Sequence, residues 1–353
     1  MDTYLAHLLQ EIHLVGRWHS ERTKVTSLYF GGGTPALAAE HLGEIVNALQ
    51  AYFEITEGIG VELHPDDVTI PVLQKLKAAS VTKISIGIQS FQRRHQQTLG
   101  RSAVSPDALQ KALSAVPFET VSMDFIFALP GQTFEDLRQD LETAFASGAN
   151  HVAIYPFIDF SFTKSSVPAM KKQEKRMLLD RITEWCLAQG YTRDSIWTFS
   201  SAPSARYSSM TRDNFLGFGC SATTLLTGQL KINTFSIDEY CSRIDQQRLP
   251  TALTLRFTKR QRMVYYLFWT AYSTRVRAGD FEAFFGVPLE KMYGAELWLA
   301  RHLGLVTKEN GTYEMTMKGA FYYHYYENFY TLAYIDKMWS ILGKEAFPDG
   351  IHL

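Results

Sequence analysis

The chain has 353 residues, enough to bury the core of one large domain or two. With 46% hydrophobic and 20% charged residues it is not a disordered protein, and its formal net charge of -1 disfavours a polyanion or an anionic membrane as the main partner. The only cysteines, Cys186, Cys220 and Cys241, are too few for a disulfide framework. We see no signal peptide and no apolar run of about 20 residues, so we expect a cytoplasmic protein.

Short apolar runs alternate with helical patterns over the first 200 residues, beginning with an amphipathic helix at 3–18. The predicted strands lie at 25–30, 59–63, 83–88, 121–127, 151–157 and 193–199. Strands that are apolar on both faces and alternate with helices are typical of parallel βα units. We therefore expect an α/β fold with a partial parallel (β/α) barrel and a ligand site at the carboxyl ends of its strands. A doubly wound open sheet is the alternative.

The pattern becomes mostly helical after about residue 250. The predicted elements are helices at 257–274, 281–285, 289–302 and 319–341, and a hairpin over 303–317. An Asn310-Gly311 pair supplies the hairpin turn, and this order of elements is typical of a winged-helix-like domain. The predicted segments are a partial barrel over 1–205, a connecting segment with a glycine-rich loop over 206–250, and a helical C-terminal domain over 251–353.

A glycine-rich turn, Gly31-Gly32-Gly33-Thr34, follows the first predicted strand. Glycines lack a Cβ atom, so their backbone N–H groups can approach a ligand closely. The carboxyl end of a parallel strand is a natural place for such a ligand. Taken alone, the glycines are equally well explained as a tight turn.

Four polar side chains follow at or near the ends of later strands. Glu62 is an acid inside an apolar strand, where a charge needs a partner, so it should meet a cationic or amino group. The planar fork of Arg101 suits a ligand carboxylate, and Asp124 can accept hydrogen bonds from ribose hydroxyls. Gln89 adds a polar amide at the end of an apolar strand. Together with the glycine turn, these residues predict a pocket for a nucleoside attached to an amino acid.

Each of these side chains also has an ordinary structural explanation. Glu62 and Arg101 can form a salt bridge with each other, Gln89 can cap a helix, and Asp124 can orient a loop. Cys220 lies in a glycine-bounded loop but is better explained by packing than as a nucleophile. The aromatic run over 321–330 could suit a flat ligand, although at helical spacing it is more often core.

These motifs, in this order, resemble the oxygen-independent coproporphyrinogen III oxidase-like branch of the radical S-adenosylmethionine enzymes. The matching segments are Tyr4-x-x-x-Leu-Leu-x-Glu-Ile, Leu28-Tyr-Phe-Gly-Gly-Gly-Thr-Pro-Ala-Leu, Val61-Glu-Leu-His-Pro, Ile86-Gly-Ile-Gln-Ser-Phe, Leu99-Gly-Arg, Met123-Asp-Phe-Ile-Phe-Ala-Leu-Pro-Gly-Gln-Thr and Leu216-Gly-Phe-Gly-Cys-Ser-Ala. The resemblance implies a barrel of radical S-adenosylmethionine type that lacks its first strand. It covers nearly the whole chain.

The resemblance also implies a cofactor, a substrate and a set of contacts. The positions that match S-adenosylmethionine contacts are Gly32, Gly33, Thr34, Glu62, Gln89, Arg101 and Asp124, with weaker, largely backbone contacts at Ile158 and Thr223. Arg101 would hold the carboxylate, Glu62 the amino group, and Gln89 with Asp124 the ribose. The implied reaction is oxidative decarboxylation of propionate side chains of a tetrapyrrole, with an electron donor such as flavodoxin or ferredoxin.

The family's Cys-x-x-x-Cys-x-x-Cys motif, which binds a [4Fe-4S] cluster, would lie upstream of Tyr4 and is not in these 353 residues. Cys186, Cys220 and Cys241 are too far apart to replace it. We expect either an N-terminally truncated oxidoreductase, which the retained site residues favour, or a relative without a cluster.

Three other interpretations stay open. The chain could be a non-catalytic haem- or porphyrin-binding or haem-transfer protein that uses its aromatic-rich C-terminal domain, or a relative of the radical S-adenosylmethionine methyltransferases. The winged-helix-like segment could bind a nucleic acid, which the near-neutral charge disfavours.

Overall fold

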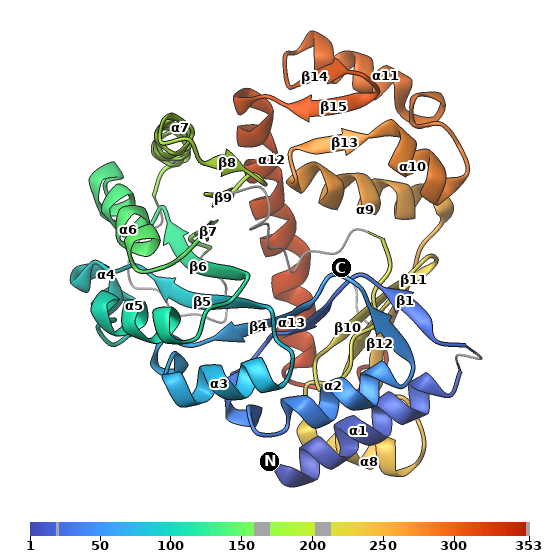
Figure 1. Cartoon of the computed structure of the whole chain (residues 1–353). Coiled ribbons are helices and arrows are strands. Elements are labelled where there is room, and N and C mark those ends of the chain that lie inside the picture. Colours follow the sequence, from blue (N-terminus) through green and yellow to red (C-terminus); the bar gives the residue numbers. More distant parts are fainter. Residues whose placement is uncertain (19–20, 159–169, 202–212, 351–353) are drawn as a thin grey trace. The chain divides into compact units, whose positions relative to one another are not determined.

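The computed structural model describes residues 1–18, 21–158, 170–201 and 213–350 (Figure 1). These residues form two compact units. The sheet unit contains residues 16–18, 21–158 and 170–201, and the terminal unit contains residues 1–15 and 213–350. None of the described helices is long and apolar enough to cross a membrane.

The sheet unit is built on a seven-stranded sheet with the order β2-β4-β5-β6-β7-β9-β8. The strands are β2 (Leu28–Phe30), β4 (Ile59–Leu63), β5 (Lys83–Gln89), β6 (Thr120–Phe127), β7 (His151–Pro156), β8 (Thr192–Arg193) and β9 (Thr198–Ser200). Strands β2, β4, β5, β6 and β7 pair in parallel in that order, whereas β9 pairs antiparallel with both β7 and β8. The parallel βα arrangement predicted from the alternating pattern is therefore present.

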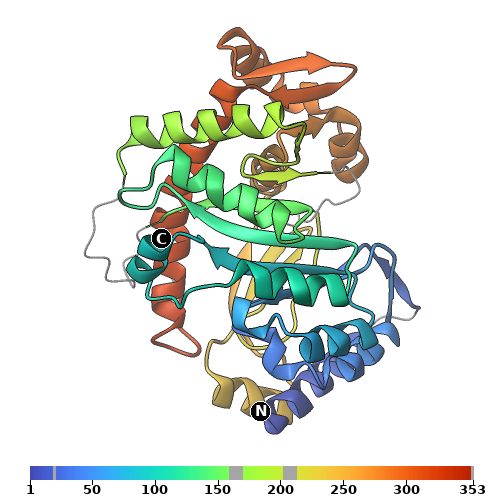
Figure 2. The same cartoon turned by 60° about the vertical axis from the view of Figure 1, so that its left-hand side comes forward.

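Helices connect the parallel strands and lie along one face of the sheet (Figures 1 and 2). The helices of this unit are η1 (Pro35–Ala38), α2 (Leu42–Gln50), η2 (Pro65–Asp67), α3 (Ile70–Ala78), α4 (Arg93–Thr98), α5 (Pro106–Ala115), α6 (Phe134–Ala146) and α7 (Lys172–Ala188). The start of α6 is fixed by a capping box, in which Thr133 and Asp136 bond each other's backbone N–H groups. Side chains such as Leu73, Leu137 and Leu141 are fully buried, so these helices cover the apolar face of the sheet.

The prediction of one strand over 25–30 is wrong. The chain forms β1 (Thr23–Val25), which pairs with β3 (Phe53–Ile55) in a separate two-stranded sheet, and then β2. The segment between β3 and β4 turns at Gly58, whose φ is +103°. The chain between β1 and β2 follows this turn, because the Leu28 N–H donates to the Gly58 carbonyl. The predicted strand over 193–199 is instead the short antiparallel pair of β8 and β9.

The terminal unit contains a helix from the start of the chain and all elements after residue 213. Its elements are α1 (Asp2–Gly16), β10 (Thr223–Leu226), β11 (Gln229–Asn233), α8 (Ile237–Asp245), β12 (Thr251–Arg256), α9 (Lys259–Tyr272), β13 (Arg275–Arg277), α10 (Ala278–Phe285), α11 (Leu289–His302), β14 (Val306–Glu309), β15 (Thr312–Met315), α12 (Met317–Tyr330), the π-helix η4 (Thr331–Ile335) and α13 (Asp336–Leu342). Strands β10, β11 and β12 form an antiparallel sheet that the sequence analysis missed.

A winged-helix-like arrangement is present after residue 258, as predicted. Strands β14 and β15 form a hairpin whose turn is Asn310-Gly311, both with left-handed φ values of 46° and 75°, and β13 adds a third strand. The helices close over a core that includes Phe281 and Leu289, each fully buried. The predicted segment boundaries at 205 and 250 stay a prediction.

A buried acid joins α1 to the glycine-rich loop before β10. Glu11 accepts hydrogen bonds from Gly219 N–H (2.7 Å), Asn233 Nδ2 (3.1 Å) and the Tyr240 hydroxyl (2.7 Å). Burial raises the pKa of Glu11 to about 7, although these three donors act in the opposite direction. The Cys220 N–H bonds to the Tyr4 hydroxyl at 3.1 Å, which adds a second link between the same two segments.

We expect Glu11→Ala to destabilise the protein by about 2 kcal/mol, because it leaves buried donors without an acceptor. The free energy of unfolding in urea measures the effect. The matched control is Gln10→Ala, since Gln10 is the exposed neighbour on the same helix. A loss no larger than that of the control would contradict the importance of this contact.

Candidate functional site

A row of polar side chains crosses the sheet at one level. Glu62, Ser85, Ser122 and His151 are paired in register across β4, β5, β6 and β7, and we call them the polar row. Ser85, Ser122 and His151 are almost completely buried. Because neighbouring strands present paired residues on the same face, these four side chains share one side of the sheet.

The next row along the strands is entirely apolar. Leu63, Ile86, Met123 and Val152 are paired in register one residue further on, so they face the opposite side, where the helices pack. All four are buried. The sheet therefore has an apolar face covered by helices and a polar face. Of these two rows, the polar row is the one whose side chains can donate and accept hydrogen bonds with a ligand.

Asp124 lies on the polar face, two residues after Ser122. It accepts hydrogen bonds from the Ser85 hydroxyl (2.8 Å) and the Ser122 hydroxyl (3.2 Å). Burial raises the pKa of Asp124 to about 6, the two hydroxyls oppose this rise, and the charge of Glu62 adds to it. His151 Nδ1 lies 2.9 Å from the Ser122 oxygen, and burial lowers the pKa of this histidine to about 4, so its ring is neutral near pH 7.

Glu62 is bound to the glycine-rich turn. Its Oε1 accepts a hydrogen bond from the Tyr29 hydroxyl, and its Oε2 accepts one from the Gly32 N–H at 3.0 Å. A Cβ atom at Gly31 would lie 2.6 Å from the Tyr29 ring and 3.2 Å from the Glu62 carboxyl carbon, so this approach requires a glycine. Among the described ion pairs none joins Glu62 to Arg101, and the salt bridge considered in the sequence analysis is therefore not formed.

The turn itself needs glycine for a second reason. Gly32 and Gly33 have φ values of 76° and 60°, the left-handed region that other residues rarely adopt. A Cβ at either position would have no atom within 4 Å, so these two residues face open space. Thr34 is also exposed and directly precedes η1. The backbone at this strand end is thus accessible to a ligand.

Gln89 ends β5 in a strained conformation. Its φ is +69°, although it is not glycine, and the β5–β6 register is irregular between Ile86 and Gln89. Gln89 pairs with Phe125, the neighbour of Asp124. A Cβ at Gly87 would lie 3.1 Å from Gln89 Nε2, which places the amide directly over that glycine. Gln89 does not cap α4, whose N-cap position is Gln92.

The remaining predicted positions lie on other elements. Arg101 follows α4 in a loop with its side chain exposed, and Ile158 is half-buried two residues after β7. Thr223 is the first residue of β10 and belongs to the terminal unit, whereas the other predicted positions belong to the sheet unit. The structure thus bonds Gly32 to Glu62 and places Glu62 and Asp124 on the same face of the sheet. The role of each predicted position in binding a cofactor stays a prediction.

The three cysteines of the sequence are divided between the two units. Cys186 is buried in α7, where burial raises the pKa of its thiol, and it belongs to the sheet unit. Cys220 and Cys241 belong to the terminal unit, and the Cys220 thiol donates to the Thr234 carbonyl at 3.1 Å. No group of three or more His, Cys, Asp or Glu side chains within the described ranges is placed to bind a metal ion.

Sequence reasoning missed Tyr29, Ser85, Ser122 and His151. A signal for two of them was present: Ser85 lies between two buried isoleucines, and Ser122 is spaced two residues from Asp124 in an otherwise apolar strand. This spacing puts polar residues on one face of a strand. Only the register between strands shows that they meet.

Comparison with known proteins identifies a domain and two groups of relatives. Residues 7–144 match the radical SAM superfamily, so the chain contains a radical SAM domain. It is homologous both to the HemW heme chaperones and to the oxygen-independent coproporphyrinogen III oxidases. Among solved structures, it is similar to coproporphyrinogen III oxidase (HemN) from Escherichia coli, with a TM-score of 0.75, 20% identity, and coverage of 93% of this chain and 81% of that chain. This match confirms the predicted fold.

The two groups of relatives differ in how far they align. The HemW heme chaperones of Bacillus subtilis and of Lactococcus lactis subsp. lactis are 24% and 25% identical, covering 90% of this chain and 88% and 86% of their own lengths. The oxygen-independent coproporphyrinogen III oxidase of Pseudomonas aeruginosa is 23% identical over 70% of this chain and 60% of its own length.

We expect Asp124→Asn to stabilise the protein at pH 7 by about 2 kcal/mol, because the folded state holds Asp124 at a pKa of about 6, above its ordinary value of 3.8. A raised carboxyl pKa means that the folded state binds the proton more tightly. The stability contributed by Asp124 therefore falls as the pH rises from about 4 to about 6.

The measurement is the unfolding free energy of both proteins at pH 4 and pH 7. The advantage of the variant should be small at pH 4 and full at pH 7. Asp107→Asn, at an exposed position in the first turn of α5, is the control and should show no such pH dependence. A variant that is less stable than the unchanged protein at pH 7 would contradict the expected cost of the buried charge.

Proposed function

We propose that this protein binds S-adenosylmethionine on the polar face of its sheet and a tetrapyrrole at a second surface, and that it carries or transfers haem or a porphyrin. One observation carries the proposal. The polar row is assembled in register across β4 to β7, and Glu62 of that row is bonded to the glycine turn. The similarity to heme chaperones over nearly their full length supports the same conclusion.

The residues of the polar face fit an adenosyl-amino acid in kind. Gly32 and Gly33 leave open backbone next to Glu62, which would face the amino group. Asp124 is an acceptor at the same face, and Gln89 pairs with Phe125, the residue after Asp124; an acceptor and an amide so placed would suit ribose hydroxyls. Arg101 is exposed and would reach the carboxylate. When bound, S-adenosylmethionine would supply a sulfonium centre.

An exposed aromatic face on α12 supports the tetrapyrrole part. Tyr322, Tyr325, Tyr326 and Phe329 follow the spacing i, i+3, i+4 and i+7 and are 49%, 49%, 64% and 57% exposed. We call these four residues the aromatic stripe. A stripe of exposed rings is a typical contact surface for a flat apolar ligand. The interpretation of 321–330 as core therefore holds only in part, for buried residues such as Phe321 and Tyr323.

A second candidate function is the oxidase reaction, in which propionate side chains of a tetrapyrrole are oxidatively decarboxylated with electrons from a flavodoxin or ferredoxin. The assembled polar row favours it, as does the similarity to the oxidases. It requires thiolate ligands that these 353 residues do not group together, and we derive no reaction step through a cluster.

We expect haem to bind the aromatic stripe and to shift its Soret absorption band on titration. The double variant Tyr326→Ala/Phe329→Ala should weaken binding at least fivefold, because it removes the two most exposed rings of the stripe. Trp298→Ala is the matched control, since Trp298 is 64% exposed on α11 of the same unit but outside the stripe. No Soret shift would rule out haem binding, and equal weakening by the control would rule out this surface.

We expect S-adenosylhomocysteine, a stable analogue of the cofactor, to bind in isothermal titration calorimetry. Glu62→Gln should weaken its binding about tenfold, because the variant loses the charge that faces the amino group and disturbs the glycine turn. Glu57→Gln, an exposed acid shortly before β4, should leave the affinity unchanged. If the unchanged protein binds no analogue, the cofactor part of the proposal is wrong.

A further inference from the structure

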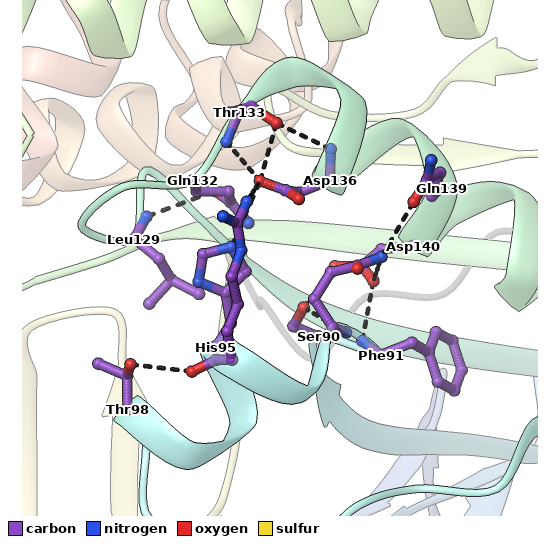
Figure 3. Close-up of polar contacts among 12 residues, drawn as sticks. Ser90, Phe91, His95, Thr98, Leu129, Gln132, Thr133, Asp136, Gln139 and Asp140 are labelled. Atoms are coloured by element: carbon purple, nitrogen blue, oxygen red, sulfur yellow. Dashed lines mark hydrogen bonds and ion pairs between the residues drawn. The ribbon is translucent and has the colours of Figure 1, made fainter.

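A buried acid on α6 holds the turn that follows β5. Asp140 is completely buried, and its Oδ2 accepts a hydrogen bond from the Ser90 hydroxyl at 2.7 Å. Its Oδ1 accepts from the Phe91 N–H at 2.8 Å and, more weakly, from Gln92 Nε2 at 3.4 Å (Figure 3). All of its donors thus come from three consecutive residues of one turn.

This turn directly follows the strained residue Gln89. A left-handed non-glycine residue persists only where its surroundings hold it in place, and such residues are frequent at ligand sites. The Ser90 and Phe91 bonds to Asp140 start at the very next position. The Gln89 side chain lies over Gly87, since a Cβ atom at Gly87 would lie 3.1 Å from Gln89 Nε2.

The same turn holds the segment that carries Arg101. Gln96 is buried, its Nε2 donates to the Ser90 carbonyl at 2.8 Å, and its own carbonyl accepts the Arg101 N–H at 2.9 Å. Two hydrogen bonds therefore connect the Asp140-bound turn to the backbone of Arg101. Gln89 and Arg101, which are twelve positions apart in sequence, depend on one carboxylate.

A second acid on the same helix holds α4. Asp136 pairs with Arg94, and His95 Nε2 lies 3.5 Å from its carboxylate (Figure 3). Asp136 also accepts from Thr133 N–H at 2.7 Å in the capping box. Asp140, in contrast, has only neutral donors among its hydrogen-bond partners.

We propose that Asp140 is a positioning residue that sets Gln89 and Arg101 for ligand binding without touching the ligand. The inference rests on the proposed S-adenosylmethionine site. In this role, α6 fixes the conformation of the turn that follows β5. Its effect should appear in the affinity of the folded protein and in the protection of the turn.

Three variants separate this role from a merely structural one. Asp140→Ala removes every contact to the turn, whereas Ser90→Ala removes one hydroxyl and leaves the rest of the protein intact. Asp140→Asn keeps one carbonyl acceptor for the Phe91 N–H, and the Ser90 hydroxyl can reverse its bond, so it should partly restore function. Glu142→Gln is the control, because Glu142 is an exposed acid on the same helix.

The experiment measures two quantities at a temperature where circular dichroism shows each variant to be folded. The first is the affinity for S-adenosylhomocysteine, which should fall at least tenfold for Asp140→Ala, about threefold for Ser90→Ala, and less for Asp140→Asn than for Asp140→Ala. The second is amide hydrogen exchange of the peptide spanning 88–93, which should accelerate at least tenfold for Asp140→Ala and remain unchanged for Glu142→Gln.

Each outcome decides between the claims. If Ser90→Ala and folded Asp140→Ala both bind S-adenosylhomocysteine as tightly as the unchanged protein, the inference is overturned. The proposed cofactor site is then still intact. Unchanged exchange of 88–93 in Asp140→Ala also overturns it, because the turn would then not depend on this acid. If the unchanged protein binds no analogue, the proposed cofactor site fails first, and the ligand role of Asp140 fails with it.

Discussion

The alternation of side chains along paired parallel strands is the constraint on which the rest of this structure depends. Once helices cover one face, the residues on that face must be apolar, and each intervening residue is directed to the other side. Leu63, Ile86, Met123 and Val152 satisfy the first requirement. The polar row occupies the opposite side at the same level of each strand, so side chains from four separate segments lie on one face.

Four acids of this protein share one kind of environment. Glu11, Glu62, Asp124 and Asp140 all accept hydrogen bonds from hydroxyl, amide or backbone N–H groups, and no described ion pair involves any of them. Neutral donors fix the direction of a carboxylate without cancelling its charge. At Asp124 and Glu62 the charge therefore remains available to a bound ligand, whereas at Glu11 and Asp140 it is used to organise a loop.

Much of the fold could be predicted because strong local patterns coincided with tertiary structure. The strand at 59–63 and the Asn310-Gly311 hairpin depend on periodicity and turn chemistry, which are local. The split of 25–30 into β1 and β2 could not be predicted, because it depends on a hydrogen bond to Gly58 in the turn between β3 and β4. The polar types at Glu62, Gln89 and Asp124 were recognisable, but their partners were not. Ser85 meets Asp124, and Tyr29 meets Glu62, only through strand register. The sheet of β10, β11 and β12 was missed because its strands are short and weakly apolar.

The spacing of Asp136 and Asp140 places a geometric restriction on α6. Four residues apart, they lie on the same side of the helix and engage two successive parts of the preceding βα unit. A single residue added between them would turn one carboxylate away from the other by about 100°. Homologous proteins that use this arrangement should tolerate many substitutions on the outer surface of this helix, but neither insertions nor deletions within its first two turns.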